Sequence, residues 1–374
     1  MSLPPALAAA LARLRRWLVE DAYPIWWERG ADPAGGFHDR LNLDGTPVPG
    51  PKRLRVQARQ AWCYAQARRL GWQGPAEAAM RHGLGAVALG LDADGLYRSA
   101  PGDRYAGFDG MGELYDQAFV LLALAAPRFD ERAMEQRAVR LRERLAPFAH
   151  PLGGYAEAPG LTAPLFANPN MHLFESFVAW SEVSDGPAWA DLAAGQAALA
   201  LGRLIDPQTG ALPEAFGPDW AAADEPAMRA VWPGHLFEWA WLLMRWPGRG
   251  PEAMAAALKL VEIGEGRGVD ADRNVAIFAL DGTLEPRDRG ARLWSQTERI
   301  KATALAASLT GDEGLWDAAA RACEGLEAFL DVPTRGLWRD WMDGAGGFRD
   351  EPAPASSFYH IVGAIAELAR LAGA

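Results

Sequence analysis

Apolar and polar residues follow one another along the chain in two kinds of helical pattern. In the first kind, apolar residues recur every three or four positions among charged ones, as Met134, Val139, Leu141 and Leu145 do in 131–145. This spacing predicts an amphipathic helix with one face in water. The pattern occurs in six stretches: 4–29, 75–90, 130–147, 187–204, 251–265 and 313–330.

The second kind of pattern is apolar on nearly every side of the helix. "MHLFESFVAW" at 171–180 and "PGHLFEWAWLLM" at 233–244 have no stripe that could face water, so we expect these helices to be covered all round. Six stretches have this character: 55–70, 111–126, 169–184, 233–246, 292–309 and 356–371.

A turn signal recurs after each amphipathic stretch. It combines an acidic residue or histidine with glycine and an aromatic residue or leucine, and its copies start 56 to 64 residues apart. The copies are "DPAGGFHD" from Asp32, "DADGLYRS" from Asp92, "HPLGGYAE" from His150, "DPQTGALPEA" from Asp206, a degenerate one from Asp270, and "DVPTRGLWRD" from Asp331. Six repeats of one amphipathic and one buried helix fill the chain.

Buried helices alternating with amphipathic ones predict an all-α fold, an (α/α)6 barrel with an inner and an outer ring of six helices each. We expect residues 1–374 to form one such catalytic domain, with the glycine-rich turns at one end. An open solenoid is the alternative, but solenoid inner helices usually leave one face in solvent.

The repeat also relates polar residues on the buried helices. His172 and His235 both stand in the tetrapeptide "HLFE", and steps of about one repeat lead from them to Glu298 and His360. Steps in the other direction lead to Tyr115 and Arg59. In a closed ring these groups would converge at one end of the axis, among helix amino termini that supply free N–H donors.

Each of these residues also has a structural interpretation. A single buried histidine is commonly a core residue. Arg59 could be an ion-pair partner of Glu175 or Glu298, because a buried arginine needs such a partner. Tyr115 could serve packing alone. Glu175 and Glu238 follow a histidine by three residues on the same helix face, so they could simply orient it. The three histidines lie on separate helices without a His-Glu-x-x-His motif, and we predict no metal.

Composition narrows the class of protein. The net charge is −11 without a basic run, which argues against nucleic-acid binding. Only three lysines occur, none in a phosphate-binding loop motif. Cys63 and Cys323 are too few for a disulfide framework. The amino terminus lacks the features of a secretory signal, and no apolar run is long enough to cross a membrane, so we expect a cytoplasmic protein.

Five motifs, in order along the chain, resemble the N-acylglucosamine 2-epimerase superfamily, which contains sugar 2-epimerases and the mannose and sulfoquinovose isomerases. They are "VQAR" at 56–59, "NPNMHLFE" at 168–175, "PGHLFEWAWLL" at 233–243, Trp294 with Glu298, and "FYH" at 358–360. The resemblance runs from about residue 20 to the end. It implies an (α/α)6 barrel and a cofactor-independent reaction at C2 of an aldose.

The resemblance also implies roles for the site residues. His235 and His360 would be the acid/base pair, and His172 would help to open the sugar ring. Arg59 would bind sugar oxygens, and Tyr115, Glu175, Glu238, Trp294 and Glu298 would complete the pocket. Imidazoles are suitable bases for removing a proton beside an aldehyde, and donors such as arginine stabilise the enediolate that forms.

The motifs are most similar to the mannose isomerase branch, so D-mannose and D-fructose are the expected pair, with a monosaccharide as the only partner of a monomer or homodimer. One histidine serving C2 and C1 would give the ketose, and two on opposite faces the epimer. A sulfonated or phosphorylated sugar would need extra cations, for which Arg55 and Arg229 are the candidates. A glycoside hydrolase, with two glutamates across the cleft, or a carbohydrate-binding module are the more distant alternatives.

Overall fold

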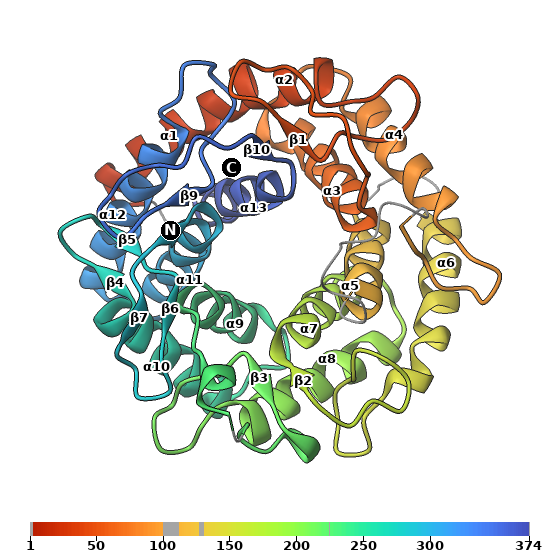
Figure 1. The fold of residues 1–374 in the computed structure, drawn as a ribbon, viewed down its shortest axis with the longest axis vertical. Coiled ribbons are helices and arrows are strands. Elements are labelled where there is room, and N and C mark those ends of the chain that lie inside the picture. The colour runs from red at the N-terminus through yellow and green to blue at the C-terminus, as the bar shows by residue number, and fades with distance from the viewer. Residues whose placement is uncertain (1–2, 100–111, 127–130, 224, 374) are drawn as a thin grey trace.

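Six helices surround a central axis in the computed structural model, which describes residues 3–99, 112–126, 131–223 and 225–373. Each inner helix packs against the next one, and the sixth packs against the first, so the ring is closed (Figure 1). The inner helices are α3 (Leu54–Leu70), α5 (Gly112–Ala125), α7 (Ala167–Ser181), α9 (Pro233–Arg245), α11 (Leu293–Thr310) and α13 (Ser356–Leu371).

An outer layer of helices covers this ring. Helix α1 (Pro5–Trp17) continues through a π-helical segment (Leu18–Ala22) into α2 (Tyr23–Glu28) and packs against α12 and α13. The remaining outer helices each pack on the inner helix that precedes them: α4 (Ala76–Leu89), α6 (Glu131–Arg144), α8 (Pro187–Leu199) with its π-helical extension Ala200–Leu204, α10 (Pro251–Arg267) and α12 (Glu313–Leu330). The (α/α)6 barrel is therefore confirmed, and the solenoid is wrong because α13 closes on α3.

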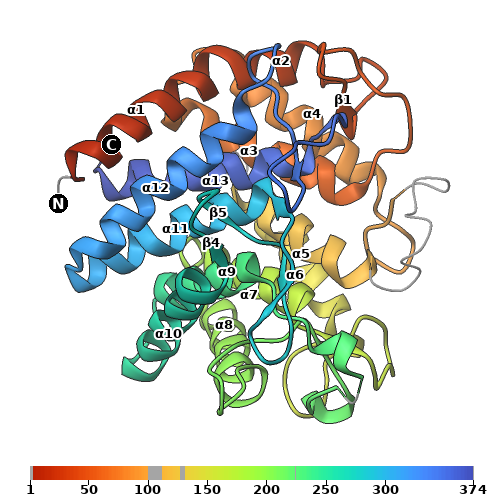
Figure 2. The ribbon, with the colours of Figure 1, turned by 60° about the vertical axis from the view of Figure 1, so that its left-hand side comes forward.

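The two ends of the barrel differ because the connections differ in length. Short links such as 71–75 and 311–312 join each inner helix to its outer partner, and Gly71 and Gly311 end α3 and α11 with positive φ angles of 105° and 76°. Long loops lead from the outer helices back to the inner ones. The described parts of these loops gather at the end where the inner helices begin (Figure 2).

Short antiparallel strands tie these long loops together. Strand β1 (Arg40–Leu41) pairs with β10 (Ala353–Pro354), which joins the first loop to the last. The other pairs are β2 (Leu165–Phe166) with β3 (Ala215–Phe216), β4 (Val269–Asp270) with β5 (Val275–Ala276), β6 (Ala279–Leu280) with β7 (Pro286–Asp288), and β8 (Ala291–Arg292) with β9 (Trp341–Met342). Three-residue or four-residue 3-10 turns lie at Ala146–Phe148, Pro218–Trp220 and Pro226–Arg229.

Most of the predicted glycine-rich turns form as expected. Those after Asp32, Asp92 and His150 close small antiparallel bridges, for example Ala31 with Phe37. In the last unit the chain also turns after Asp331: Gly336 has a φ of 88°, and Arg339 N donates to Phe329 O at 2.9 Å, as His38 N does to Gly30 O at 2.8 Å. A second small bridge joins Met342 to Phe348 in "DGAGGF".

A side-chain amide on the following inner helix holds several of these turns. The amide of Gln57 accepts a hydrogen bond from Phe37 N at 2.6 Å and donates one to Phe37 O at 2.9 Å. Gln117, Asn170 and Gln296 hold Tyr97, Tyr155 and Ala276 in the same way. Because Gln57, Asn170 and Gln296 each stand two residues before a predicted site residue, these contacts fix the helix starts that carry the site.

The described residues contain no helix that is long and apolar enough to cross a membrane. Cys63 and Cys323 are buried free thiols. Many of the tryptophans, including Trp26, Trp189, Trp239 and Trp338, are buried in the core between the two rings.

Candidate active site

A cavity of about 180 Å³ opens at the end of the barrel where the inner helices begin. The side chains lining it come from all the inner helices and from the loops before them. They are Arg59, Tyr115, Asn168, His172, Trp232, His235, Glu238, Arg292, Trp294, Ser356, Ser357 and His360. Seven of the nine predicted site residues are in this set. The other two, Glu175 and Glu298, lie one layer deeper.

Each of the three imidazoles has a glutamate at its Nδ1 atom. The distances are 2.8 Å from His360 to Glu298, 2.7 Å from His235 to Glu214, and 3.4 Å from His172 to Glu175. A carboxylate can only accept a hydrogen bond and cannot donate one, so Nδ1 carries the proton. Nε2 is then the basic nitrogen of the neutral ring.

The partner of His235 was not predicted. Glu238 stands three residues after His235, but its nearest imidazole is that of His172, at 3.9 Å, and Glu214 orients His235 instead. Glu214 lies in the long loop before α9, just before β3, where the helical repeat gives no signal. Loop pairing with β2 brings it beside the pocket.

Burial keeps the imidazoles of His172 and His360 neutral. It lowers the pKa of His172 to about 4, although its bond to Glu175 acts in the opposite direction. Burial also lowers the pKa of His360 well below the usual histidine value, and the charges of Arg59 and Lys301 add to this effect. Both rings are therefore unprotonated near neutral pH, which is the form in which an imidazole can act as a base.

We expect the acid limb of kcat/KM to lie below pH 6.5, the unperturbed histidine value. A protonated base is inactive, and a lowered pKa postpones protonation to more acidic solution, so activity should persist below that pH. The measurement is initial rate against pH at low substrate concentration. An acid limb at or above pH 6.5 would contradict burial of a neutral base.

Arg59 is buried on α3 and lines the cavity. Its Nη2 donates to the Tyr115 hydroxyl at 2.7 Å, and its guanidinium lies 4.0 Å from the ring centre of Phe119. Among the described residues it forms no ion pair, and its Nε has no partner. The alternative interpretation, a structural ion pair of Arg59 with Glu175 or Glu298, is thus wrong. A buried guanidinium with unused donors is suited to bind ligand oxygens.

Tyr115 and Phe119 show a small error of register in the predicted repeat. Gln117 holds its turn as Gln57 does, so the position on α5 that corresponds to Arg59 is Phe119, and Tyr115 lies one helical turn nearer the mouth. Positions four residues apart share a helix face, so Tyr115 still reaches the pocket.

A layer of buried charged groups forms the floor beneath the cavity. Lys301 Nζ forms an ion pair with one oxygen of Glu298 at 2.6 Å, and the other oxygen accepts a hydrogen bond from His360 Nδ1 at 2.8 Å. Tyr359 donates a hydrogen bond to Glu175. Lys301 stands three residues after Glu298, the same spacing as His172 to Glu175, so the repeat could have identified it.

The carboxylates of the floor differ in charge state. Burial, with repulsion from Glu298, raises the pKa of Glu238 well above its usual value, and neither of its oxygens has a partner among the described residues. Burial opposes ionisation of Glu175, but hydrogen bonding from His172 and the charge of Lys301 outweigh it and lower its pKa. Lys301 itself keeps a raised pKa because the attraction of Glu298, Glu238 and Glu175 exceeds the cost of burial.

Two groups in this layer have ligand atoms within 4.8 Å of one another, close enough to hold a metal ion: His172, Glu175 and Glu238, and Glu238, Glu298 and His360. Lys301 already places a positive charge 2.6 Å from Glu298. An ammonium group there would repel a cation, so a metal-independent site stays our prediction.

Replacing Glu214 by glutamine should lower kcat roughly ten- to a hundredfold, by analogy with loss of outer partners of functional imidazoles. The amide can donate as well as accept, so it no longer selects the Nδ1–H tautomer of His235. Steady-state kinetics across pH would measure this. A change of melting temperature with an unaltered pH profile of kcat would instead indicate a purely structural role.

Comparison with known proteins agrees with this geometry. The family model described as N-acylglucosamine 2-epimerase matches residues 35–364. The chain is 43% identical to the mannose-6-phosphate isomerase of Rhizobium meliloti (strain 1021) in an alignment of 376 positions that covers 95% of each protein. It is 29% identical to the D-mannose isomerase of Thermobifida fusca over 384 residues, covering 90% of this chain and 89% of that one.

The fold is also similar to a crystal structure of D-mannose isomerase, with a TM-score of 0.85 at 21% identity, covering 99% of this chain and 100% of the other. These similarities define the chain as an enzyme of the sugar isomerase and epimerase class. It belongs to the N-acylglucosamine 2-epimerase family.

Proposed function

We propose that this enzyme interconverts D-mannose and D-fructose through a cis-enediolate, with His360 and His235 as the acid/base pair. The observation that supports this most directly is the pairing of each imidazole with its own glutamate at the wall of one small cavity. The indole of Trp294 lies between them, with ring centres 4.9 Å from His235 and 5.8 Å from His360.

The reaction follows from these groups. In the open-chain aldose, a neutral imidazole removes the proton from C2, and the electrons form the C1–C2 double bond of the enediolate while O1 gains negative charge. The guanidinium of Arg59 stabilises that charge. Return of the proton to C1, with transfer of the O2 proton to O1, gives the ketose. His172, buried and neutral beside Glu175, is placed to assist ring opening.

An isomerase acting on mannose 6-phosphate is the second candidate, favoured by the 43% identity to the mannose-6-phosphate isomerase of Rhizobium meliloti. Neither predicted cation lines the cavity: Arg55 pairs with Asp116 at 2.8 Å, and Arg229 donates to Ala223 O at 2.6 Å. Arg292 does line it, paired with Asp340 at 2.6 Å, and is the group that could meet a phosphate.

The test is incubation with D-mannose, and separately with D-mannose 6-phosphate, in D2O with NMR detection. We expect fructose carrying deuterium at C1 from the free sugar. Turnover of the phosphate ester alone would select the second candidate, and deuterated glucose would show epimerisation. If both sugars remain unlabelled, the proposal is wrong, and a hydrolase or binding module gains support.

A further inference from the structure

A second, larger cavity of about 480 Å³ lies at the opposite end of the barrel axis. Its walls are the carboxyl-terminal halves of the inner helices, whereas the candidate active site is built from their amino-terminal halves. Its volume falls in the range of roughly 300–1,000 Å³ that is usual for small-molecule sites. None of the catalytic imidazoles lines it.

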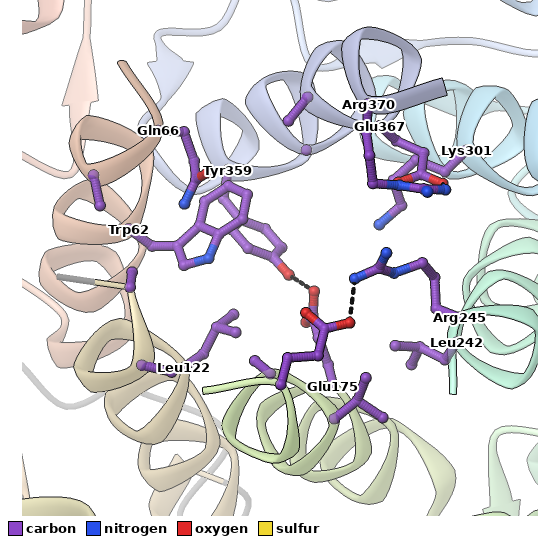
Figure 3. A pocket seen from close by; sticks show the side chains of 18 of the residues that line it. Trp62, Gln66, Leu122, Glu175, Leu242, Arg245, Lys301, Tyr359, Glu367 and Arg370 are labelled. Atoms are coloured by element: carbon purple, nitrogen blue, oxygen red, sulfur yellow. Dashed lines mark hydrogen bonds and ion pairs between the residues drawn. The ribbon is translucent and has the colours of Figure 1, made fainter. Parts of the chain in front are cut away.

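Guanidinium groups surround this cavity from three helices. Arg245 on α9 pairs with Glu182 at 2.6 Å, Arg370 on α13 pairs with Glu367 at 2.6 Å, and Arg69 on α3 donates to the Gln66 side chain at 2.9 Å. Arginines in the last turn of a helix offset its negative end. Arg245 and Arg370 also converge on one cavity, as Figure 3 shows. Stabilising the helix ends does not require this convergence.

The charges of the described lining residues do not cancel. Three guanidinium groups face the carboxylates of Glu182 and Glu367, while Lys301 and Glu175 offset each other, which leaves one positive charge in excess. The side chain of Glu182 is 40% exposed and that of Arg370 is 38% exposed, so one member of each pair is open to solvent and can move around an entering anion.

An aromatic wall faces these cations. Trp62 projects into the cavity across from Arg245 and Lys301 (Figure 3), and its ring centre is 5.0 Å from that of Tyr359. Gln66 lies beside it on α3 and offers amide hydrogen bonds. An indole face next to polar groups suits the apolar face of a sugar ring, and arginines opposite it suit a phosphate or carboxylate.

We propose that this cavity, which we call the distal site, binds a monosaccharide carrying one anionic group, a phosphate or a carboxylate. The ring lies against Trp62, and the anion lies between Arg245 and Arg370. This ligand is an effector and not the substrate, because no imidazole among the described residues lines this cavity to remove a proton from carbon, as the histidines of the other pocket can.

Only one layer of side chains separates the distal site from the catalytic residues. Glu175 and Lys301 line the distal site, and each also contacts the machinery above: Glu175 reaches His172, and Lys301 reaches His360 through Glu298. A bound anion that attracts Lys301 weakens its hold on Glu298 and so changes turnover. This consequence, unlike binding itself, rests on the proposed function.

Binding is tested calorimetrically on the full-length protein, which needs no activity. The ligands are D-glucose 6-phosphate, D-glucuronate, D-glucose and inorganic phosphate. We expect each charged sugar to bind at least about tenfold more tightly than glucose. Comparing D-glucose 6-phosphate with D-glucuronate then shows whether phosphate or carboxylate is the preferred anion. Trp62→Leu should weaken the charged sugars but leave inorganic phosphate unchanged.

Charge variants separate binding from a role in helix stability. Arg245→Ala with Arg370→Ala should weaken charged-sugar binding about tenfold or more, while Glu182→Gln should strengthen it, because Arg245 is released. Arg267→Ala, at the exposed end of α10, is the matched control. The proposal fails if no charged sugar binds at millimolar concentration, or if binding ignores these distal changes and responds only to Arg59→Ala in the other pocket.

Discussion

Replacing His360 by asparagine should lower kcat for sugar isomerisation about a thousandfold or more, within the range lost when a general acid/base is removed. Asparagine cannot accept a proton from carbon, although its amide can still donate to Glu298 where Nδ1 did, at 2.8 Å. The fold should therefore remain. Exchange of the C2 hydrogen with D2O, followed by NMR, reports proton removal directly.

His38→Asn is the control, since this histidine lies outside the cavity beside Asp32 at 3.9 Å and should leave turnover unchanged. The paired variant His235→Asn distinguishes the two proton routes. If a single histidine serves both C1 and C2, only the variant that lacks this histidine loses exchange of the C2 hydrogen with D2O, and the other variant still exchanges it, though slowly. If His360→Asn exchanges at the normal rate, His360 is not the base and the assignment of the acid/base pair must be reversed.

The ring and most of the site could be predicted from sequence because both depend on periodicity. Inner helices covered on every side must be apolar all round, so His172, His235 and His360 stand out against that background and share one phase of the repeat. The predicted helix ranges agree with the observed ones to within about two residues at most ends, as expected where helix boundaries depend on capping.

Features outside the period could not be predicted in this way. Glu214 reaches His235 from a loop whose path depends on the pairing of β2 with β3, which lies outside the helical pattern. Tyr115 lies one turn off the predicted phase because the loop before α7 is shorter: 15 residues separate Tyr155 from Asn170, against 20 from Tyr97 to Gln117. The distal site could not be predicted because its arginines lie at the ends of three helices, where basic residues are common.

Lys301 could have been predicted from the repeat, because it occupies the same repeat position as Glu175, three residues after Glu298. Its side chain is 2% exposed, and its ammonium forms an ion pair with Glu298 at 2.6 Å and lies 3.8 Å from the ring centre of Trp241. It is the cation that faces the floor carboxylates Glu298, Glu238 and Glu175. The ion pair it forms holds the carboxylate that orients His360.

Replacing Lys301 by methionine should therefore lower both stability and activity. Methionine keeps the length of the side chain but leaves buried Glu298 without its counter-charge, which costs about 3–5 kcal/mol when one partner of a buried pair is removed. Glu298 would then take up a proton, donate to His360 or turn away, and kcat should fall roughly a hundredfold. Urea unfolding and steady-state kinetics measure the two effects.

Lys259→Met provides the control, because this lysine is 47% exposed and pairs with Glu262 at 2.9 Å on the surface of α10, where loss of a pair costs about 0–1 kcal/mol. The double variant Lys301→Met with Glu298→Gln removes both charges together. It should recover most of the stability, since an uncharged pair needs no counter-ion, but little of the activity, because a neutral amide holds the His360 tautomer less firmly. Equal recovery of both would mean that Lys301 serves the fold alone.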